Sequence, residues 1–309
     1  MNTSSPLSGG VATLTRWGVM RARGADAAGF LHSQLTSDMS SLDARQARLA
    51  GFCSAKGRLQ ASFLVWRPAP DELLLACDTG VLAPTLKRLS MFVLRAKCKL
   101  DDASAEWPLR GMAGEAATRL AGDAAVWERR EIGAASLIRL PDAAGLTRVL
   151  LAGPQDLGEV PALDEAAWRW LEVQAGVPTI EPATIDRFVP QMLNLELLGG
   201  VDFRKGCYPG QEIVARSQYR GTLKRRMFLF DVDAEAHAGQ EVFHSEDPGQ
   251  PAGMVANAAA RPGGGSSLLV ELKLAVLDHG SLHLGAPGGP ALSRGELPYS
   301  VPFDAAQPA

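Results

Sequence analysis

The stretch of the chain with the most chemically capable side chains is the octet KGCYPGQE at 205–212. Its thiol, Cys207, follows two cations, Arg204 and Lys205, and nearby positive charge favours the thiolate, which is the reactive form. The Pro-Gly pair after the tyrosine predicts a tight turn. An isolated cysteine is most simply a small core residue, but these neighbours favour a working thiol at Cys207, with Lys205 promoting its ionisation.

The octet also carries groups that suit a flat, polar ligand. Tyr208 offers a ring for stacking, Gln211 offers an amide, and Glu212 offers a carboxylate that can accept N–H donors. The turn predicts that Tyr208 and Glu212 face the same space. Basic residues follow the octet, and arginine binds carboxylates through a two-pronged fork. They are Arg216, Arg220, Lys224, Arg225 and Arg226.

A second basic cluster precedes the octet at Lys87, Arg88, Arg95, Lys97 and Lys99. Either basic cluster, taken alone, is better explained as a solvated face, because charged side chains mostly face water. The functional alternative is a surface that receives anions.

The composition limits the class of protein. A length of 309 residues predicts two or three domains, and a net charge of −3 argues against a dedicated nucleic-acid-binding protein. The cysteines form no CxxC pair, so no metal site is predicted. The N-terminus lacks the basic and apolar regions of a signal peptide, and no apolar run has the length of a membrane span. We therefore expect a cytoplasmic monomer with no membrane partner.

Periodicity predicts a mixed α and β body followed by an all-β unit. Expected elements are a helix near Phe30 after a cap at Asp26, paired strands over 59–65 and 73–77, a helix over 82–93, a strand over 96–100 and a helix over 163–174 that Gly176 ends. The Ala- and Gly-rich stretch 111–160 predicts a subdomain. Six short apolar runs then predict an antiparallel β-barrel or sandwich: 227–232, 240–244, 253–258, 267–277, 281–285 and 297–303.

The octet and several longer blocks together resemble the YgfZ family of folate-binding proteins, which is similar in fold to the T protein of the glycine cleavage system. The blocks are 30–39, 52–66, 86–102, 171–178 and 193–221. The resemblance implies an α+β, aminomethyltransferase-like folate-binding fold. Residues 1–225 would form two intertwined, partly ferredoxin-like subdomains around a central cavity. Residues 226–309 would form a C-terminal antiparallel β-barrel.

The resemblance also implies a function. The protein would bind tetrahydrofolate, or a one-carbon-substituted folate, as an accessory factor in iron–sulfur cluster assembly or repair. It would thereby support iron–sulfur enzymes such as those that modify tRNA, and its partners would be iron–sulfur proteins or their assembly machinery. Cys207 would be the working thiol. Tyr208, Gln211 and Glu212 would contact the pterin, and the arginines Arg216 and Arg226 would bind the glutamate tail.

One departure from the T protein bears on activity. Those aminomethyltransferases carry an acidic pair in the region that matches 55–61, where this chain has Leu59, Gln60 and Ala61. Without that acid, no group is evident there to share the proton traffic of one-carbon transfer. The accessory role is therefore favoured, and an acid contributed from elsewhere would favour the alternative, a folate-dependent aminomethyltransferase or demethylase. RNA binding through the basic residues after the octet is a weaker alternative, which a steep salt dependence would reveal.

Overall fold

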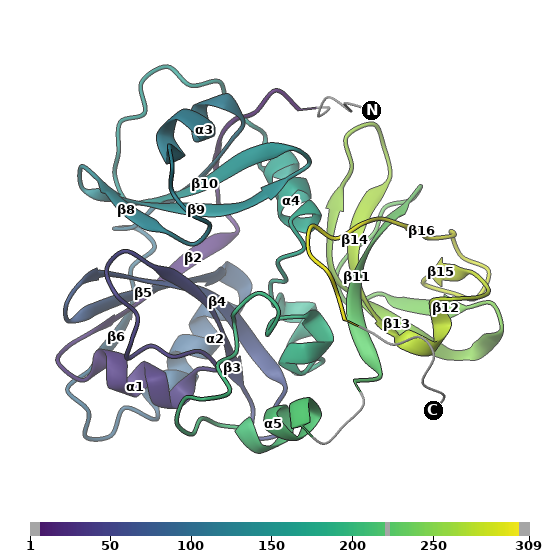
Figure 1. The fold of residues 1–309 in the computed structure, drawn as a ribbon, viewed down its shortest axis with the longest axis horizontal. Helices are drawn as coiled ribbons and strands as arrows, with labels where there is room; N and C mark the ends of the chain where they lie inside the picture. The colour runs from purple at the N-terminus through teal and green to yellow at the C-terminus, as the bar shows by residue number, and fades with distance from the viewer. Residues whose placement is uncertain (1–6, 220–222, 303–309) are drawn as a thin grey trace.

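The computed structural model describes residues 7–219 and 223–302, which form three antiparallel sheets with helices packed around them (Figure 1). The first sheet has the strand order β3-β4-β5-β2-β6. Its strands are β3 (Ala47–Cys53), β4 (Leu59–Ala69), β5 (Glu72–Asp78), β2 (Trp17–Arg23) and β6 (Lys99–Asp102), and α1 (Ala27–Gln34) and α2 (Thr79–Ser90) cover one of its faces.

Strand β4 is buried on both faces. Ala61, Phe63 and Val65 pack in the cluster beneath the helices, whereas Leu64 and Trp66 belong to the main core on the opposite side. The alternation that predicted this strand, and its pairing with β5, are confirmed. The opposite face of the sheet is therefore available to form the wall of an internal cavity.

The second sheet has the order β1-β7-β10-β9-β8. Four of its strands, and a helix that accompanies them, come from residues 109–152, which overlap the Ala- and Gly-rich stretch. They are β7 (Leu109–Ala113), α3 (Glu115–Ala121), β8 (Arg129–Ile132), β9 (Ala135–Ala143) and β10 (Leu146–Ala152). The edge strand β1 (Gly10–Thr13) comes from the start of the chain and pairs with β7. The unit is thus completed by a distant segment.

Helix α4 (Glu165–Gln174) lies between this body and the C-terminal sheet (Figure 1). The Asp164 carboxylate caps it by accepting from the Ala166 N–H. Gly176, at φ +66°, follows its end. The predicted helix and its stop are confirmed. Short turns of 3₁₀ helix at η1 (Pro182–Thr184) and η2 (Pro190–Leu193) then lead to α5 (Gln211–Tyr219).

The C-terminal unit is one curled, six-stranded antiparallel sheet of order β15-β12-β13-β14-β11-β16. Its elements are β11 (Arg225–Val232), β12 (Glu241–His244), β13 (Asp247–Ala260), β14 (Ser266–Lys273), η3 (Leu274–Val276), β15 (Leu282–Leu284) and β16 (Ser293–Arg294). The closed barrel expected from the six apolar runs is therefore wrong, because the sheet is a half-barrel.

The last apolar run explains the difference. Within its described part, up to residue 302, it forms no strand. Pro298 and Pro302 lack the N–H that a ladder needs. Leu297 instead packs on the main core, and the Tyr299 hydroxyl donates to the Gly176 carbonyl at 2.8 Å. The run ties the sheet to α4 rather than closing a barrel.

Two local predictions are also corrected. Ala96 and Cys98 lie before β6, which begins at Lys99, so the predicted strand is shorter than expected. Asp26 occupies the N-cap of α1, but its side chain bonds no helix N–H and instead accepts from the Lys97 N–H. Among the helices of the described residues, none is long and apolar enough to cross a membrane.

Candidate functional site

The octet folds as a tight turn against the body. Gly210 has φ +78°, in the region that favours glycine. A Cβ there would stand 2.4 Å from the Ser54 carbonyl oxygen and 2.7 Å from the Gly57 Cα. The turn predicted from Pro209 and Gly210 is confirmed, and it packs directly on the turn between β3 and β4. Helix α5 begins at the next residue, Gln211.

Lys205 holds the octet to the end of α1. Its Nζ donates to the carbonyl oxygens of His32 at 2.5 Å and Leu35 at 2.9 Å, where a cation suits the negative end of the helix dipole. The same ammonium stands 4.7 Å from the centre of the Tyr208 ring. Burial lowers the pKa of Lys205 to about 8, against the opposing effect of the Asp38 carboxylate. Lys205 is thus an anchor as well as a charge beside the thiol.

All four cysteines lie in the described part of the chain, and Cys207 is the exposed one. Cys53 and Cys77 are buried and Cys98 is half-buried. Burial raises the pKa of Cys53 to about 12 and also raises the pKa of Cys77. A buried thiol with a raised pKa is inert, so exposure singles out Cys207.

The other predicted residues of the octet are not gathered on one surface. Tyr208 is buried, with Lys205 against its ring, whereas Glu212 is exposed on α5. Gln211 is half-buried and Arg216 is exposed on the same helix. The expected common face for Tyr208 and Glu212 is therefore wrong, because the tyrosine turns into the core.

The basic residues after the octet separate as well. Arg226 is buried in β11, ion-paired with Glu196, and its Nη1 also donates to the Gln191 carbonyl. Its guanidinium thus supports the junction with η2 inside the protein. Arg225 pairs with Glu271 on β14, and Arg220 lies outside the described residues.

The structure places a cavity between the two body sheets and α4, and none of its lining residues was predicted from the sequence to be a site residue. Its wall is mostly apolar and includes three of the six tryptophans of the chain. The cavity has a volume of about 50 Å³. The lining residues are Trp17, Leu49, Leu64, Trp127, Leu140, Pro141, Arg148, Leu150, Trp168, Glu172, Val177 and Thr179.

Glu172 is the one carboxylate among these lining residues. Its Oε1 accepts two indole N–H bonds, from Trp17 at 2.9 Å and from Trp168 at 2.8 Å. Burial raises the pKa of Glu172 to about 7, although the charge of Arg148 acts in the opposite direction. The sequence does carry a signal for Glu172, because this carboxylate lies among apolar residues of a predicted helix. An acidic residue at such a position is more often functional than simply solvated.

Arg148 reaches the same cavity from β10. Its side chain is almost fully buried, its Nε donates to the Pro141 carbonyl at 3.0 Å, and its guanidinium carbon stands 5.2 Å from the centre of the Trp168 ring. Its Nη1 is buried and has no hydrogen-bond partner among the described residues. Burial lowers the pKa of Arg148 to about 10, so the guanidinium stays charged at neutral pH.

Trp127 lines the cavity in an unusual backbone conformation. Its φ is +68°, which costs a bulky L-residue roughly 1–3 kcal/mol. The conformation is fixed by two backbone bonds, from the Trp127 N–H to the Arg139 carbonyl and from the Ala47 N–H to the Trp127 carbonyl. Backbone strain of this kind is typical of binding sites.

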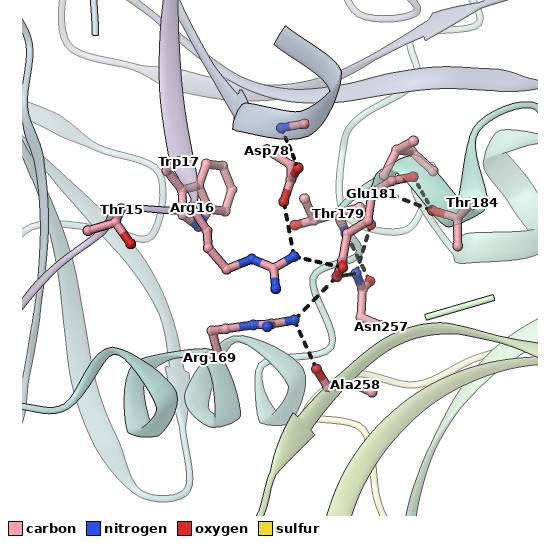
Figure 2. A network of polar contacts seen from close by, with 12 residues as sticks. Thr15, Arg16, Trp17, Asp78, Arg169, Thr179, Glu181, Thr184, Asn257 and Ala258 are labelled. Atoms are coloured by element: carbon pink, nitrogen blue, oxygen red, sulfur yellow. Dashed lines mark hydrogen bonds and ion pairs between the residues drawn. The ribbon is translucent and has the colours of Figure 1, made fainter. Parts of the chain in front are cut away.

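A second cavity adjoins the first and shares part of its wall, including Trp17, Trp168 and Glu172. Figure 2 shows the polar network at its edge. Glu181 lies at the centre of that network. It pairs with Arg16 at 2.9 Å and Arg169 at 3.5 Å and accepts from the Asn257 amide of β13 at 2.9 Å. Charged and polar contacts that join the body to the C-terminal sheet therefore form part of the wall of the second cavity.

The arrangement permits binding chemistry of a definite kind. A flat aromatic ring could stack on indoles, present N–H donors to Glu172 and present an acceptor to Arg148. No group of three or more metal-ligating side chains occurs among residues 7–219 and 223–302.

The chain is similar to several known proteins. It is 31% identical over 318 residues to the tRNA-modifying protein YgfZ of Edwardsiella ictaluri, which covers 93% of this chain and 92% of that protein. It is 31% identical over 234 residues to the tRNA-modifying protein YgfZ of Escherichia coli strain SE11, covering 70% of each. An uncharacterized protein of Haemophilus influenzae is 31% identical over 235 residues, 74% of this chain and 77% of that one. No protein-family model matches.

A solved structure extends the likeness to the fold. The glycine cleavage system aminomethyltransferase T from Bartonella henselae superposes with a TM-score of 0.75, covering 95% of this chain and 87% of that one. The sequence identity is 17%, so this similarity shows an aminomethyltransferase-like α+β fold and no more.

Proposed function

This chain belongs to the YgfZ family, and from that premise we propose that it binds a reduced folate in the central cavity. The observation that carries the proposal is Glu172, a partly buried carboxylate fixed by the indoles of Trp17 and Trp168. The pterin of a folate is a flat ring whose 2-amino group and N3–H are adjacent donors. Glu172 would accept those donors, and the indoles would pack on the ring.

The residues present suit that ligand in three ways. The wall is mostly apolar and rich in tryptophan, which is typical of small-molecule sites. The carboxylate of Glu172 is part of that wall. An N–H of Arg148 supplies a donor that has no hydrogen-bond partner among residues 7–219 and 223–302. This proposal moves the pterin contact from Glu212, which is exposed on α5, to Glu172.

For the biological role, we propose an accessory factor for iron–sulfur cluster assembly or repair, with Cys207 as the working thiol. Support comes from the exposure of Cys207 and from Lys205, which lies two residues away and is fixed by α1. The relatives are named tRNA-modifying proteins, which fits indirect support of tRNA modification. Gln211, Glu212 and Arg216 would then border the thiol on the surface that a partner meets.

A second function is favoured by the same carboxylate. The region that matches the acidic pair of the T protein contains no acidic residue in this chain. Glu172 on α4 provides a carboxyl group in the cavity instead. A carboxyl group with a pKa of about 7 exchanges protons readily at neutral pH. A folate-dependent one-carbon transferase therefore remains the alternative to the accessory role.

A ligand titration tests folate binding and separates the two roles. Tetrahydrofolate at 100 times its dissociation constant would stabilise the fold by about 2.7 kcal/mol, a rise of several degrees in melting temperature. Release of a one-carbon product from an amine donor, assayed in the same samples, would establish the transferase. An unchanged melting curve at millimolar tetrahydrofolate would rule out the folate proposal.

The role of the thiol is tested in cells that lack the native protein. We expect Cys207→Ala to fold, to bind tetrahydrofolate as the wild type does, and to fail to restore iron–sulfur enzyme activity. Cys98→Ala is the matched control, because Cys98 is half-buried and distant in sequence from the octet. Full restoration by Cys207→Ala would show that the thiol has no working role.

A further inference from the structure

The guanidinium of Arg148 is a buried charge that the protein does not fully satisfy. One N–H bonds the Pro141 carbonyl and one face stacks on Trp168, but Nη1 is buried without a partner among the described residues. Leaving a buried charged donor unpaired is costly. Because Arg148 lines the central cavity, a ligand in that cavity is the group positioned to accept this bond.

The unpaired donor lies on the same wall as the acceptor Glu172. No ion pair joins the two side chains in the described structure, although each affects the ionisation of the other. Trp168 links them, since its ring supports the guanidinium and its N–H holds the carboxylate. The cavity wall therefore presents a fixed donor, Arg148, and a fixed acceptor, Glu172, to a ligand in the cavity.

We propose that Arg148 determines ligand specificity by donating to the 4-oxo group of the pterin while Glu172 accepts from N3–H and the 2-amino group of the same ring edge. This inference rests on the proposed folate function and goes beyond it. The edge of a 4-oxopterin carries two donors followed by one acceptor. Glu172 and Arg148 are complementary to that order, and a carboxylate alone would recognise only the donors.

The pairing predicts discrimination at a single ring substituent. Replacing the 4-oxo group by an amino group puts a donor against the Arg148 donor, and it also converts N3 from an N–H donor into an acceptor that faces the Glu172 carboxylate. Hydrogen bonds to charged groups contribute enough to change affinity on the order of 10- to 100-fold. The wild-type protein should therefore bind tetrahydrofolate more tightly than 4-amino-4-deoxytetrahydrofolate by about that factor.

The test measures the dissociation constants of these two ligands for the full-length protein by quenching of tryptophan fluorescence. Arg148→Met should weaken tetrahydrofolate binding by about 10- to 100-fold and leave the 4-amino ligand nearly unchanged. The preference should therefore shrink to the part that the contact between N3 and Glu172 maintains. Arg148→Lys, which keeps a donor, should retain part of it. Arg148→Lys provides the comparison if Arg148→Met fails to fold, and an undiminished preference in Arg148→Lys would then overturn the proposal.

Three outcomes would overturn the proposal. Equal affinity of the wild type for both ligands would remove the role of Arg148 and leave folate binding intact. A loss in Arg148→Met for tetrahydrofolate but not for tetrahydropteroate, which lacks the glutamate, would assign Arg148 to the tail. Failure of every folate to bind the wild type would end this inference together with the proposed function.

Discussion

The octet and the central cavity are built in opposite ways. The octet is one continuous segment whose thiol, Cys207, is exposed. Its lysine, Lys205, is fixed by two carbonyl groups at the end of α1. The cavity is assembled from both body sheets and α4, and its polar groups are buried among tryptophans. An exposed segment suits chemistry with a partner, and an enclosed wall suits selection of a small ligand. This difference is the basis on which we propose separate tasks for the two regions.

The largest expected effect concerns thiol reactivity. A pKa of about 12 leaves Cys53 with a thiolate fraction about 1000-fold below that of an ordinary cysteine at neutral pH. We expect Cys207 to alkylate on the order of 100- to 1000-fold faster than Cys53 in the folded protein, as followed site by site by mass spectrometry. Lys205→Met should slow Cys207 by removing a neighbouring charge. Equal rates for Cys207 and Cys53 would remove the contrast between the two regions.

The next effect is the dependence of stability on pH that Glu172 imposes. Its folded pKa of about 7 lies above its unfolded value of 4.5, so the folded state holds a proton that the unfolded state releases. Stability contributed by Glu172 is present below about pH 4.5 and is lost as pH rises to about 7, by up to about 3 kcal/mol. Glu172→Gln cannot titrate and should lack this loss.

Urea unfolding at pH 5 and pH 8 measures that difference. The free energy of unfolding of the wild type, relative to Glu172→Gln, should fall between the two pH values. Glu212→Gln is the matched control, because an exposed carboxylate should leave the pH dependence of the wild type in place. A Glu172→Gln variant with the same pH dependence as the wild type would mean that Glu172 is an ordinary solvated acid.

The smallest expected effect is the difference in stability between alanine variants of two glycines, one in the octet turn and one in the open turn between β9 and β10. Gly145 and Gly210 have nearly equal φ values, +76° and +78°, but nothing lies within 4 Å of a Cβ at Gly145. Both alanine variants should lose about 1–2 kcal/mol from the left-handed conformation, and Gly210→Ala should lose about 1–3 kcal/mol more from its clash with the Ser54 turn. Thermal unfolding gives both values, and equal losses would mean that the octet turn is loosely packed.

A variant of a third glycine, Gly111, distinguishes the proposed role of the cavity from that of the octet. A Cβ at Gly111 would stand 2.4 Å from the Trp168 ring, so Gly111→Ala should displace that ring and weaken tetrahydrofolate binding. Gly210→Ala should leave tetrahydrofolate binding unchanged while altering the alkylation rate of Cys207. The reverse pattern would assign the ligand to the octet.

Local pattern predicted the elements well. The strand alternation in β4, the stripe and the glycine stop of α4, and the turn at Pro209 and Gly210 all follow from interactions between residues close in sequence, so composition and spacing were sufficient. The half-barrel was not predicted, because whether the last run pairs or docks depends on its prolines and on the contact between Tyr299 and Gly176, which joins residues far apart in the chain.

The same distinction, between contacts of residues close in sequence and contacts of residues far apart, applies to the candidate site residues. Cys207 and Lys205 could be selected from sequence because the groups around them are neighbours in the chain. Glu172, Trp17 and Arg148 meet only after two sheets and a helix pack together, so no spacing in the sequence reveals that these three side chains share one cavity. The choice of Glu212 has the same origin, because the sequence favours a carboxylate next to a recognisable motif over Glu172, whose partner Trp17 is more than a hundred residues away.

The most direct test of the account is the dissociation constant of tetrahydrofolate for Glu172→Gln and Glu212→Gln, measured by calorimetry on the full chain at pH 8. The cavity assignment predicts that Glu172→Gln weakens binding by about 100-fold, the equivalent of a charged, hydrogen-bonded contact, and that Glu212→Gln binds as the wild type does. Loss of binding in Glu212→Gln, with Glu172→Gln unaffected, would contradict it and place the folate at the octet.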